Sequence, residues 1–144
     1  MIETISGIVA ATAIIILARW LSKYVAYKLI VATNLVAIAF IYVGFSLKEN
    51  PSGPIILESA IAMLFYLLAI GGYAGDNRLL AYGIILHGIW DILHHAGSLI
   101  PTKIPVYWPS FCLVIDVIDG LYFLRIFQRE KKSANIRSAS QGFD

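Results

Sequence analysis

Cysteine and charge are scarce in this sequence. It has one cysteine, Cys112, which excludes an intramolecular disulfide, and charged residues make up only 14% of the chain. The formal net charge of +2 is too small to indicate a nucleic-acid partner. No internal repeat is found, which excludes an inverted-repeat transporter formed from one chain. No A-x-A cleavage site follows the first apolar run, so we expect that run to be retained.

Apolar residues, in contrast, make up 59% of the chain and gather in long runs. This fraction is higher than that of a typical soluble domain, and the runs approach the roughly 20 residues that a bilayer core requires. Segments 50–54 and 101–105, with two prolines each, separate some of the runs. The sequence therefore predicts an all-α, polytopic membrane protein with five transmembrane helices in one bundle, at residues 4–21, 27–47, 54–73, 79–99 and 106–127.

Residues 1–127 are expected to form this transmembrane domain, and residues 128–144 a polar, mobile tail rich in Ser, Lys and Arg. In a five-span bundle, nine of the eleven basic residues lie on the side of the tail: Arg19, Lys23, Lys28, Arg78, Arg125, Arg129, Lys131, Lys132 and Arg137. Only Lys48 and Lys103 lie on the other side. The positive-inside rule then predicts an external N-terminus and a cytoplasmic tail, with the inner membrane as the location in a bacterium.

All three histidines fall within nine residues of an otherwise apolar segment, from His87 to His95. Each residue of an α-helix turns by about 100°, so His87, Asp91, His94 and His95 share one face. The opposite face is apolar and consists of Ile85, Leu86, Ile89, Ile92 and Leu93. Ionisable groups at membrane depth are costly and normally mark a functional site. We therefore expect the chemistry of the protein on this helix.

Two other helices present acidic residues at matching depths. One face of residues 106–127 carries Cys112, Asp116, Asp119, Gly120 and Phe123, and one face of residues 54–73 carries Glu58, Ala62, Phe65, Ala69 and Gly72. A rise of about 1.5 Å per residue places Glu58 and His94 near the outer boundary. The same count places His87 and Asp116 at one deeper level. These levels predict one polar cavity with His87 and Asp116 paired at its centre.

Two arrangements satisfy these buried groups. Neutral imidazoles and carboxylates bind divalent metals, zinc in particular, and the expected ligands are His87, Asp91, His94, His95 and Asp116. Glu58 and Asp119 are then the carboxylates available as a general base. The alternative is a metal-free hydrogen-bond network in which histidines donate to aspartates, as in proton relays. Cys112 is either a small buried filler or an additional ligand.

The helix with the pattern H-x-x-W-D-x-x-H-H resembles that of small uncharacterised bacterial integral membrane proteins, a family that brings no assigned function. Three functions therefore stay open. The first is a metal-dependent hydrolase that takes a lipid-like small-molecule substrate from the lipid bilayer. The second is an oligomeric, for example homodimeric, proton, cation or metal-ion carrier or channel. The third is a non-catalytic ligand-binding or structural subunit whose polar cluster fixes helix register.

The distribution of basic residues gives a test of orientation. With nine of eleven lysines and arginines on one side, a fluorescent protein fused after Asp144 should fluoresce in a bacterial host. Alkaline phosphatase fused at the same position should be inactive. The reverse result, a dark fluorescent fusion and an active phosphatase, would show that the orientation is inverted or that the number of spans is wrong.

Overall fold

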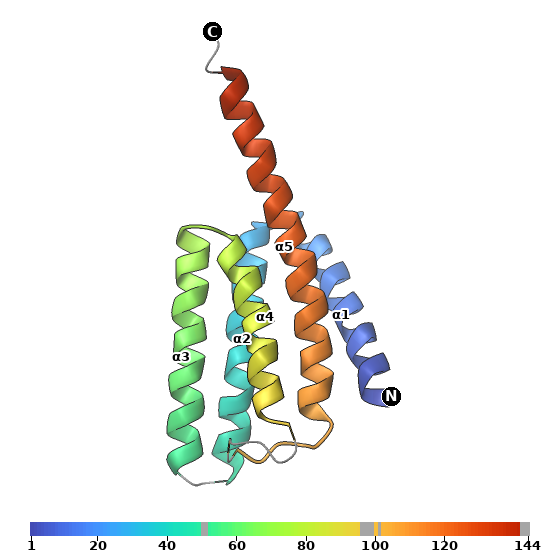
Figure 1. The fold of residues 1–144 in the computed structure, drawn as a ribbon, viewed down its shortest axis with the longest axis vertical. Helices are drawn as coiled ribbons and strands as arrows, with labels where there is room; N and C mark the ends of the chain where they lie inside the picture. The colour runs from blue at the N-terminus through green and yellow to red at the C-terminus, as the bar shows by residue number, and fades with distance from the viewer. Residues whose placement is uncertain (50–51, 96–99, 101, 142–144) are drawn as a thin grey trace.

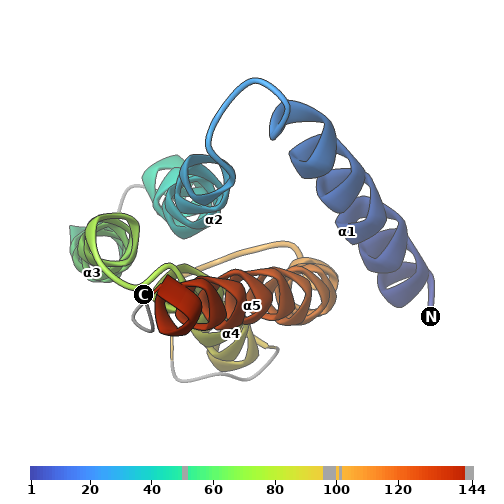
Figure 2. The same ribbon diagram turned by 90° about the horizontal axis from the view of Figure 1, so that it is seen from above.

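The computed structural model describes residues 1–49, 52–95, 100 and 102–141. These residues form five α-helices and no β-strand: α1 (Ile2–Leu21), α2 (Tyr27–Glu49), α3 (Ser52–Ala74), α4 (Arg78–Leu93) and α5 (Trp108–Gln141) (Figure 1). The all-α prediction is confirmed. Helices α2 to α5 lie side by side, and α1 packs obliquely at the edge of this group, where Gly7 approaches Val114 of α5 (Figure 2).

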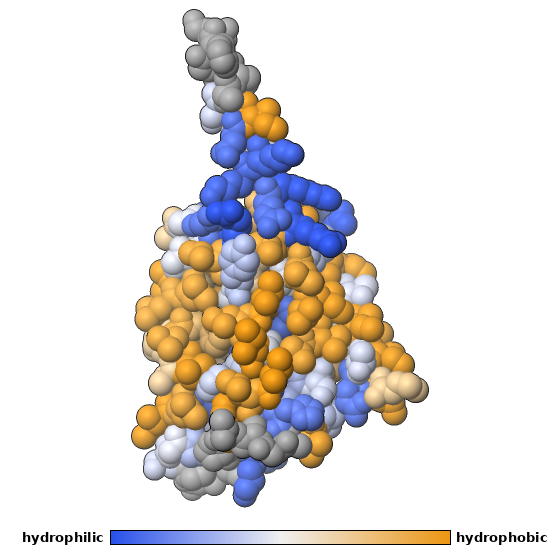
Figure 3. All heavy atoms as spheres, viewed as in Figure 1, coloured by the Kyte–Doolittle hydropathy of each residue, from blue (hydrophilic) through white to orange (hydrophobic). Residues whose placement is uncertain are grey.

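Three helices are long and apolar enough to cross a membrane by length and composition: α1, α3 and the part of α2 from Tyr27 to Lys48. Helix α4 has 16 residues, which is about 24 Å of helix and less than a bilayer core. Helix α5 carries Asp116, Asp119 and Arg125 within its apolar part. Figure 3 shows an apolar surface over the bundle, with hydrophilic residues gathered at the end from which α5 protrudes.

The ends of α4 and α5 differ from the expected ranges. Helix α4 ends at Leu93, with His94 as its C-cap, and the expected end near Leu99 lies outside the described residues. The segment expected as a polar tail continues α5 as helix to Gln141. Residues 128–141 contain neither Pro nor Gly and are rich in Arg, Lys, Glu, Gln and Ala, which favour helix.

The buried faces of the helices agree with the sequence pattern. The buried residues of α3 are those expected to share one face: Glu58, Ala62, Phe65, Ala69 and Gly72. The α4 face with Leu80, Gly83, Ile84, His87 and Asp91 is buried as well. Small residues allow close approach: a Cβ atom on Gly120 of α5 would lie 2.5 Å from Ile85 and 3.3 Å from the Ala81 carbonyl oxygen of α4. The helix that carries His87 is thus held tightly against α5.

Asp76, in the turn between α3 and α4, links that turn to the protruding part of α5. Its carboxylate accepts a hydrogen bond of 2.6 Å from Arg78 Nη2 and one of 2.9 Å from Lys131 Nζ. The Arg78 guanidinium, together with Lys131, holds the pKa of Asp76 below its usual range. Since this pKa is lowered on folding, the interaction stabilises the fold at neutral pH and is lost as the pH falls through the lowered pKa.

Two adjacent glycines of α3 provide a test of the packing. A Cβ atom on Gly72 would lie 2.7 Å from Leu80 Cδ2 and 3.0 Å from the Leu80 backbone nitrogen, whereas Gly71 has nothing within 4 Å. Gly72→Ala should therefore lower the free energy of unfolding by about 1–3 kcal/mol through overpacking. Gly71→Ala, the matched control, should be neutral or stabilising by up to about 1 kcal/mol because alanine favours helix. Thermal unfolding in detergent measures both, and equal stabilities would contradict the α3–α4 contact.

Candidate metal centre

Helices α4 and α5 bring an imidazole and two carboxylates together in the interior. His87 and Asp91 stand one turn apart on α4, and Asp116 faces them from α5, with exposed fractions of 2%, 0% and 2%. The His87 Nδ1 atom lies 2.7 Å from Asp116 Oδ2 and 3.9 Å from Asp91 Oδ1. One ligand atom from each residue lies within 4.8 Å of the others. The predicted pairing of His87 with Asp116 is confirmed.

Some polar atoms of this group have no hydrogen-bond partner among the described residues. They are Nε2 of His87 and Oδ2 of Asp91, whereas the His87 nitrogen that faces the two carboxylates is Nδ1. A buried polar atom without a partner costs free energy unless a ligand or water satisfies it. The donor chemistry, imidazole nitrogen with carboxylate oxygen, is one that binds zinc. The three residues therefore fit a divalent metal.

Charge balance in the interior is compatible with a bound cation. The buried acids in the part of the chain that the structure describes are Glu58, Asp91, Asp116 and Asp119, and no Lys or Arg is buried with them. Among the buried residues that the structure describes, His87 and His94 are the groups that can carry a positive charge. Two carboxylates that share one dry site repel each other unless a proton or a cation intervenes. A divalent cation between Asp91 and Asp116 would neutralise both.

Tyr42 of α2 belongs to the site and was missed by the sequence analysis. Its hydroxyl donates a hydrogen bond of 2.6 Å to Asp91 Oδ1, and its ring stacks on His94 with centroids 4.2 Å apart. The side chain is 1% exposed. A count of about 1.5 Å per residue from the end of α2 places Tyr42 about 10 Å deep, the level of Asp91. Its depth, equal to that of Asp91, is the signal in the sequence that identifies Tyr42 as part of the site.

Glu58 and His94 form a second polar cluster towards the end of α4. His94 Nε2 lies 2.8 Å from Glu58 Oε1, which also accepts a hydrogen bond from the Thr102 hydroxyl. The Trp90 indole N–H donates to Glu58 Oε2 at 3.2 Å. His94 Nδ1 donates to the Trp90 carbonyl oxygen at 3.0 Å. Both nitrogens of His94 are therefore engaged, and the structure does not bring this residue into the three-ligand group.

The remaining expected residues lie outside the three-ligand group. His95 is exposed, because α4 ends at Leu93 and the helical periodicity no longer applies beyond it. Asp119 is fully buried one turn beyond Asp116, and neither carboxylate oxygen has a hydrogen-bond partner within the described ranges. Cys112 is half-buried with a free thiol. Their predicted roles stay predictions.

Comparison with known proteins places the chain in one family. The model of a family of unknown function, DUF6010, matches residues 2–129. No curated protein and no solved structure matches the chain. The matched range includes the three-ligand group and the Glu58–His94 cluster.

Substitution of the central pair gives a test of the site. His87→Leu leaves the Asp116 carboxylate buried without its partner, and such a break typically costs about 3–5 kcal/mol of stability. Asp116→Leu should have an effect of similar size. The double variant should recover much of the loss because no unpaired ionisable group of the pair remains.

Thermal unfolding in detergent measures this cycle. Ile89→Ala is the control on α4, since Ile89 is 51% exposed and lies on the opposite face. Single variants that unfold like the unmodified protein, or a double variant whose loss equals the sum of the single losses, would argue against the pairing.

Proposed function

The chain belongs to this family of unknown function, and we propose that it is an integral membrane protein with five membrane-crossing helices that binds a divalent metal ion at His87, Asp91 and Asp116. The observation that carries the proposal is the cluster itself. Three ligand atoms lie within 4.8 Å of one another, all in buried residues, and in a part of the chain without a buried Lys or Arg among the described residues.

The position of α4 and α5 among the longer helices supports five crossings. Helix α4 packs against α3 at Gly72, and α5 packs against α1 at Gly7, so both run beside helices of membrane length. On its outer side α4 presents Leu86, Ile89 and Ile92, each about half exposed. An exposed apolar surface of this kind is suited to lipid rather than water.

Zinc is the metal that fits the residues best. Magnesium and calcium prefer oxygen ligands, and the imidazole of His87 favours zinc or a similar transition metal. Three protein ligands leave one tetrahedral position open, as in catalytic zinc sites. Tyr42 donates to Asp91 and so orients one of the carboxylates, which is the usual role of groups that surround a ligand set.

An open position on a metal is suited to hydrolysis. A bound metal lowers the pKa of its water and polarises a carbonyl oxygen. Of the two carboxylates predicted as general base, Glu58 already accepts hydrogen bonds from Trp90 and Thr102 and pairs with His94. Asp119 has both oxygens without a partner in the described structure, one turn from Asp116. We therefore favour Asp119 as base in a hydrolase that acts on a lipid-like substrate.

A proton carrier is the second candidate, and one observation favours it. Two hydrogen-bonded pairs, Glu58 with His94 and Tyr42 with Asp91, lie next to each other through the stacking of Tyr42 on His94. At the opposite end of the molecule, however, Arg19 and Arg129 line a surface cavity of about 490 Å³. The two arginines outnumber Glu130 in this lining, and the net positive charge disfavours the passage of a proton as well as of a metal cation. We therefore rank a carrier below a metal-binding enzyme.

Elemental analysis of the protein, purified in detergent without chelators, tests the proposal. We expect about one equivalent of zinc or another transition metal per chain. Asp91→Asn and His87→Gln should each lose most of it. Tyr42→Phe should keep the ligands and lower the metal affinity by about 10- to 100-fold, because the hydrogen bond that orients Asp91 is removed.

His95→Gln is the matched control, since His95 is exposed and outside the cluster, and its metal content should be unchanged. Less than about a tenth of an equivalent in the unmodified protein would overturn the metal assignment. Proton flux in proteoliposomes, abolished by Asp91→Asn, would then favour the carrier.

A further inference from the structure

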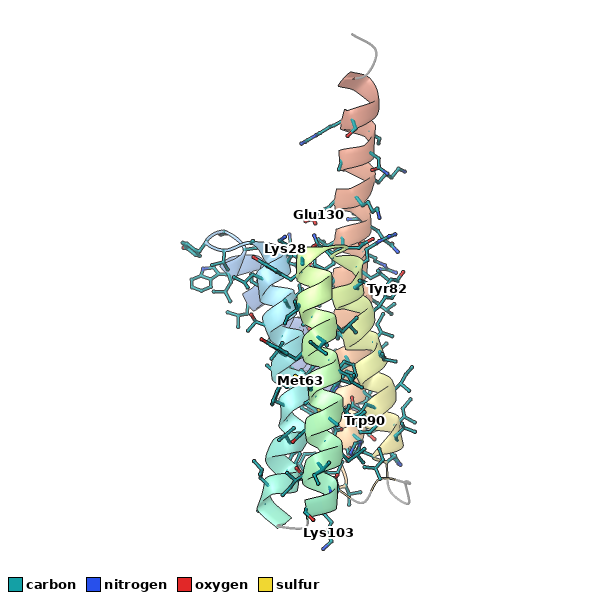
Figure 4. The ribbon with its side chains drawn as sticks, turned by 90° about the vertical axis from the view of Figure 1, so that its left-hand side faces the viewer. Lys28, Met63, Tyr82, Trp90, Lys103 and Glu130 are labelled. Carbon is teal, nitrogen blue, oxygen red and sulfur yellow. The ribbon has the colours of Figure 1, made fainter. Side chains whose placement is uncertain are left out.

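A groove of about 440 Å³ lies between α3 and α4 on the surface of the bundle. Its lining includes Ile61, Leu64 and Phe65 of α3 and Leu86, Ile89 and Trp90 of α4. Figure 4 shows Trp90 projecting from α4 on the side of α3. The indole N–H of Trp90 donates to Glu58, so even this side chain turns its polar atom to a partner in the protein. The groove therefore offers an apolar surface to a ligand.

The position of the groove determines what fills it. Leu64, Leu86 and Ile89 are 61%, 50% and 51% exposed, and α3 is one of the helices long and apolar enough to cross a membrane. An apolar groove holds water poorly, because a buried water needs two to four polar partners. Within the hydrocarbon layer the available occupant is an acyl chain. The chemistry of the walls and their place in the bilayer thus agree on one class of ligand.

The groove also borders the polar interior. Phe65 forms part of its lining, is only 6% exposed, and packs edge-on against the His87 ring with centroids 5.2 Å apart. Trp90 packs in the same way against His94 at 5.1 Å. One aromatic side chain therefore separates the groove from the candidate metal centre, and another separates it from the Glu58–His94 cluster.

We propose that this groove binds one acyl chain of a membrane phospholipid, and that Phe65 forms the partition between this chain and the centre at His87. The inference names the substrate class of the centre and in that respect rests on the proposed function. Binding of the acyl chain itself depends only on the groove and not on a bound metal. The lipid enters sideways from the bilayer, since the exposed walls on α3 and α4 open towards the hydrocarbon layer.

Quenching of Trp90 fluorescence by a phospholipid with brominated acyl chains tests the proposal. Trp20→Phe and Trp108→Phe leave Trp90 as the single tryptophan, and brominated phosphatidylcholine is titrated into the protein in detergent. We expect saturable quenching at about tenfold lower lipid content than for a surface tryptophan, which corresponds to about 1.4 kcal/mol.

The matched reference carries Trp90→Phe with Ile92→Trp. Ile92 lies two positions further along α4, is 53% exposed, and is not part of the groove lining. Equal quenching of the two tryptophans would overturn the proposal, since both would then report lipid at the general surface. Thermal unfolding of each variant is measured to check that the fold is kept.

A second pair of variants compares a phenylalanine placed in the groove with one placed on the same helix outside it. Leu64→Phe narrows the groove and should remove the preferential quenching of Trp90. Leu67→Phe, on the same helix at 55% exposure and outside the lining, should leave it unchanged. Preferential quenching that survives Leu64→Phe would place the lipid elsewhere and overturn the proposal.

Metal content measured on the same samples keeps the two proposals apart. Preferential quenching without bound metal supports the groove and overturns the metal centre. Metal without preferential quenching supports the centre and overturns the groove as the lipid site. Phe65→Ala should keep the bound metal and make the centre more accessible to the lipid. The metal affinity should then change more on addition of phospholipid than it does in the unmodified protein.

Discussion

The hydrogen bond between His87 and Asp116 joins α4 to α5 where neither side chain can reach water. In so apolar a bundle, dispersion and small residues bring the helices together, and polar pairs decide which rotation of each helix is tolerated. A rotation of α4 that moved His87 away would leave two ionisable groups unpaired in a dry interior. The close contact of Gly120 with Ile85 is compatible with this one orientation.

Tyr42 extends that constraint to α2. Through its hydroxyl it reaches Asp91, and through its ring it reaches His94, so one side chain connects the three-ligand group with the Glu58 cluster of α3. Four helices therefore contribute to one polar assembly. This connection accounts for the agreement in depth between residues that are far apart in the sequence, because each partner has to stand at the level of the next.

Much of this arrangement could be predicted from the sequence, and the limits have physical causes. Helical periodicity identified the buried face of α3 and the inward residues of α4, since an apolar environment leaves polar side chains only one direction. It failed at His95, where the helix had already ended. The engagement of both nitrogens of His94 depends on Trp90 and Thr102, whose contacts cross between segments. Periodicity within one helix contains no information about such contacts.

The continuity of α5 has a mechanical consequence. One uninterrupted helix carries Asp116 in the interior and Lys131 beyond the bundle, where Lys131 meets Asp76. Helix α5 is therefore attached at two levels, through Asp116 to His87 in the interior and through Lys131 to Asp76 at the end of the bundle. Both contacts are made with the segment from Asp76 to Asp91, so the axial register of α5 against α4 is fixed at two separate points.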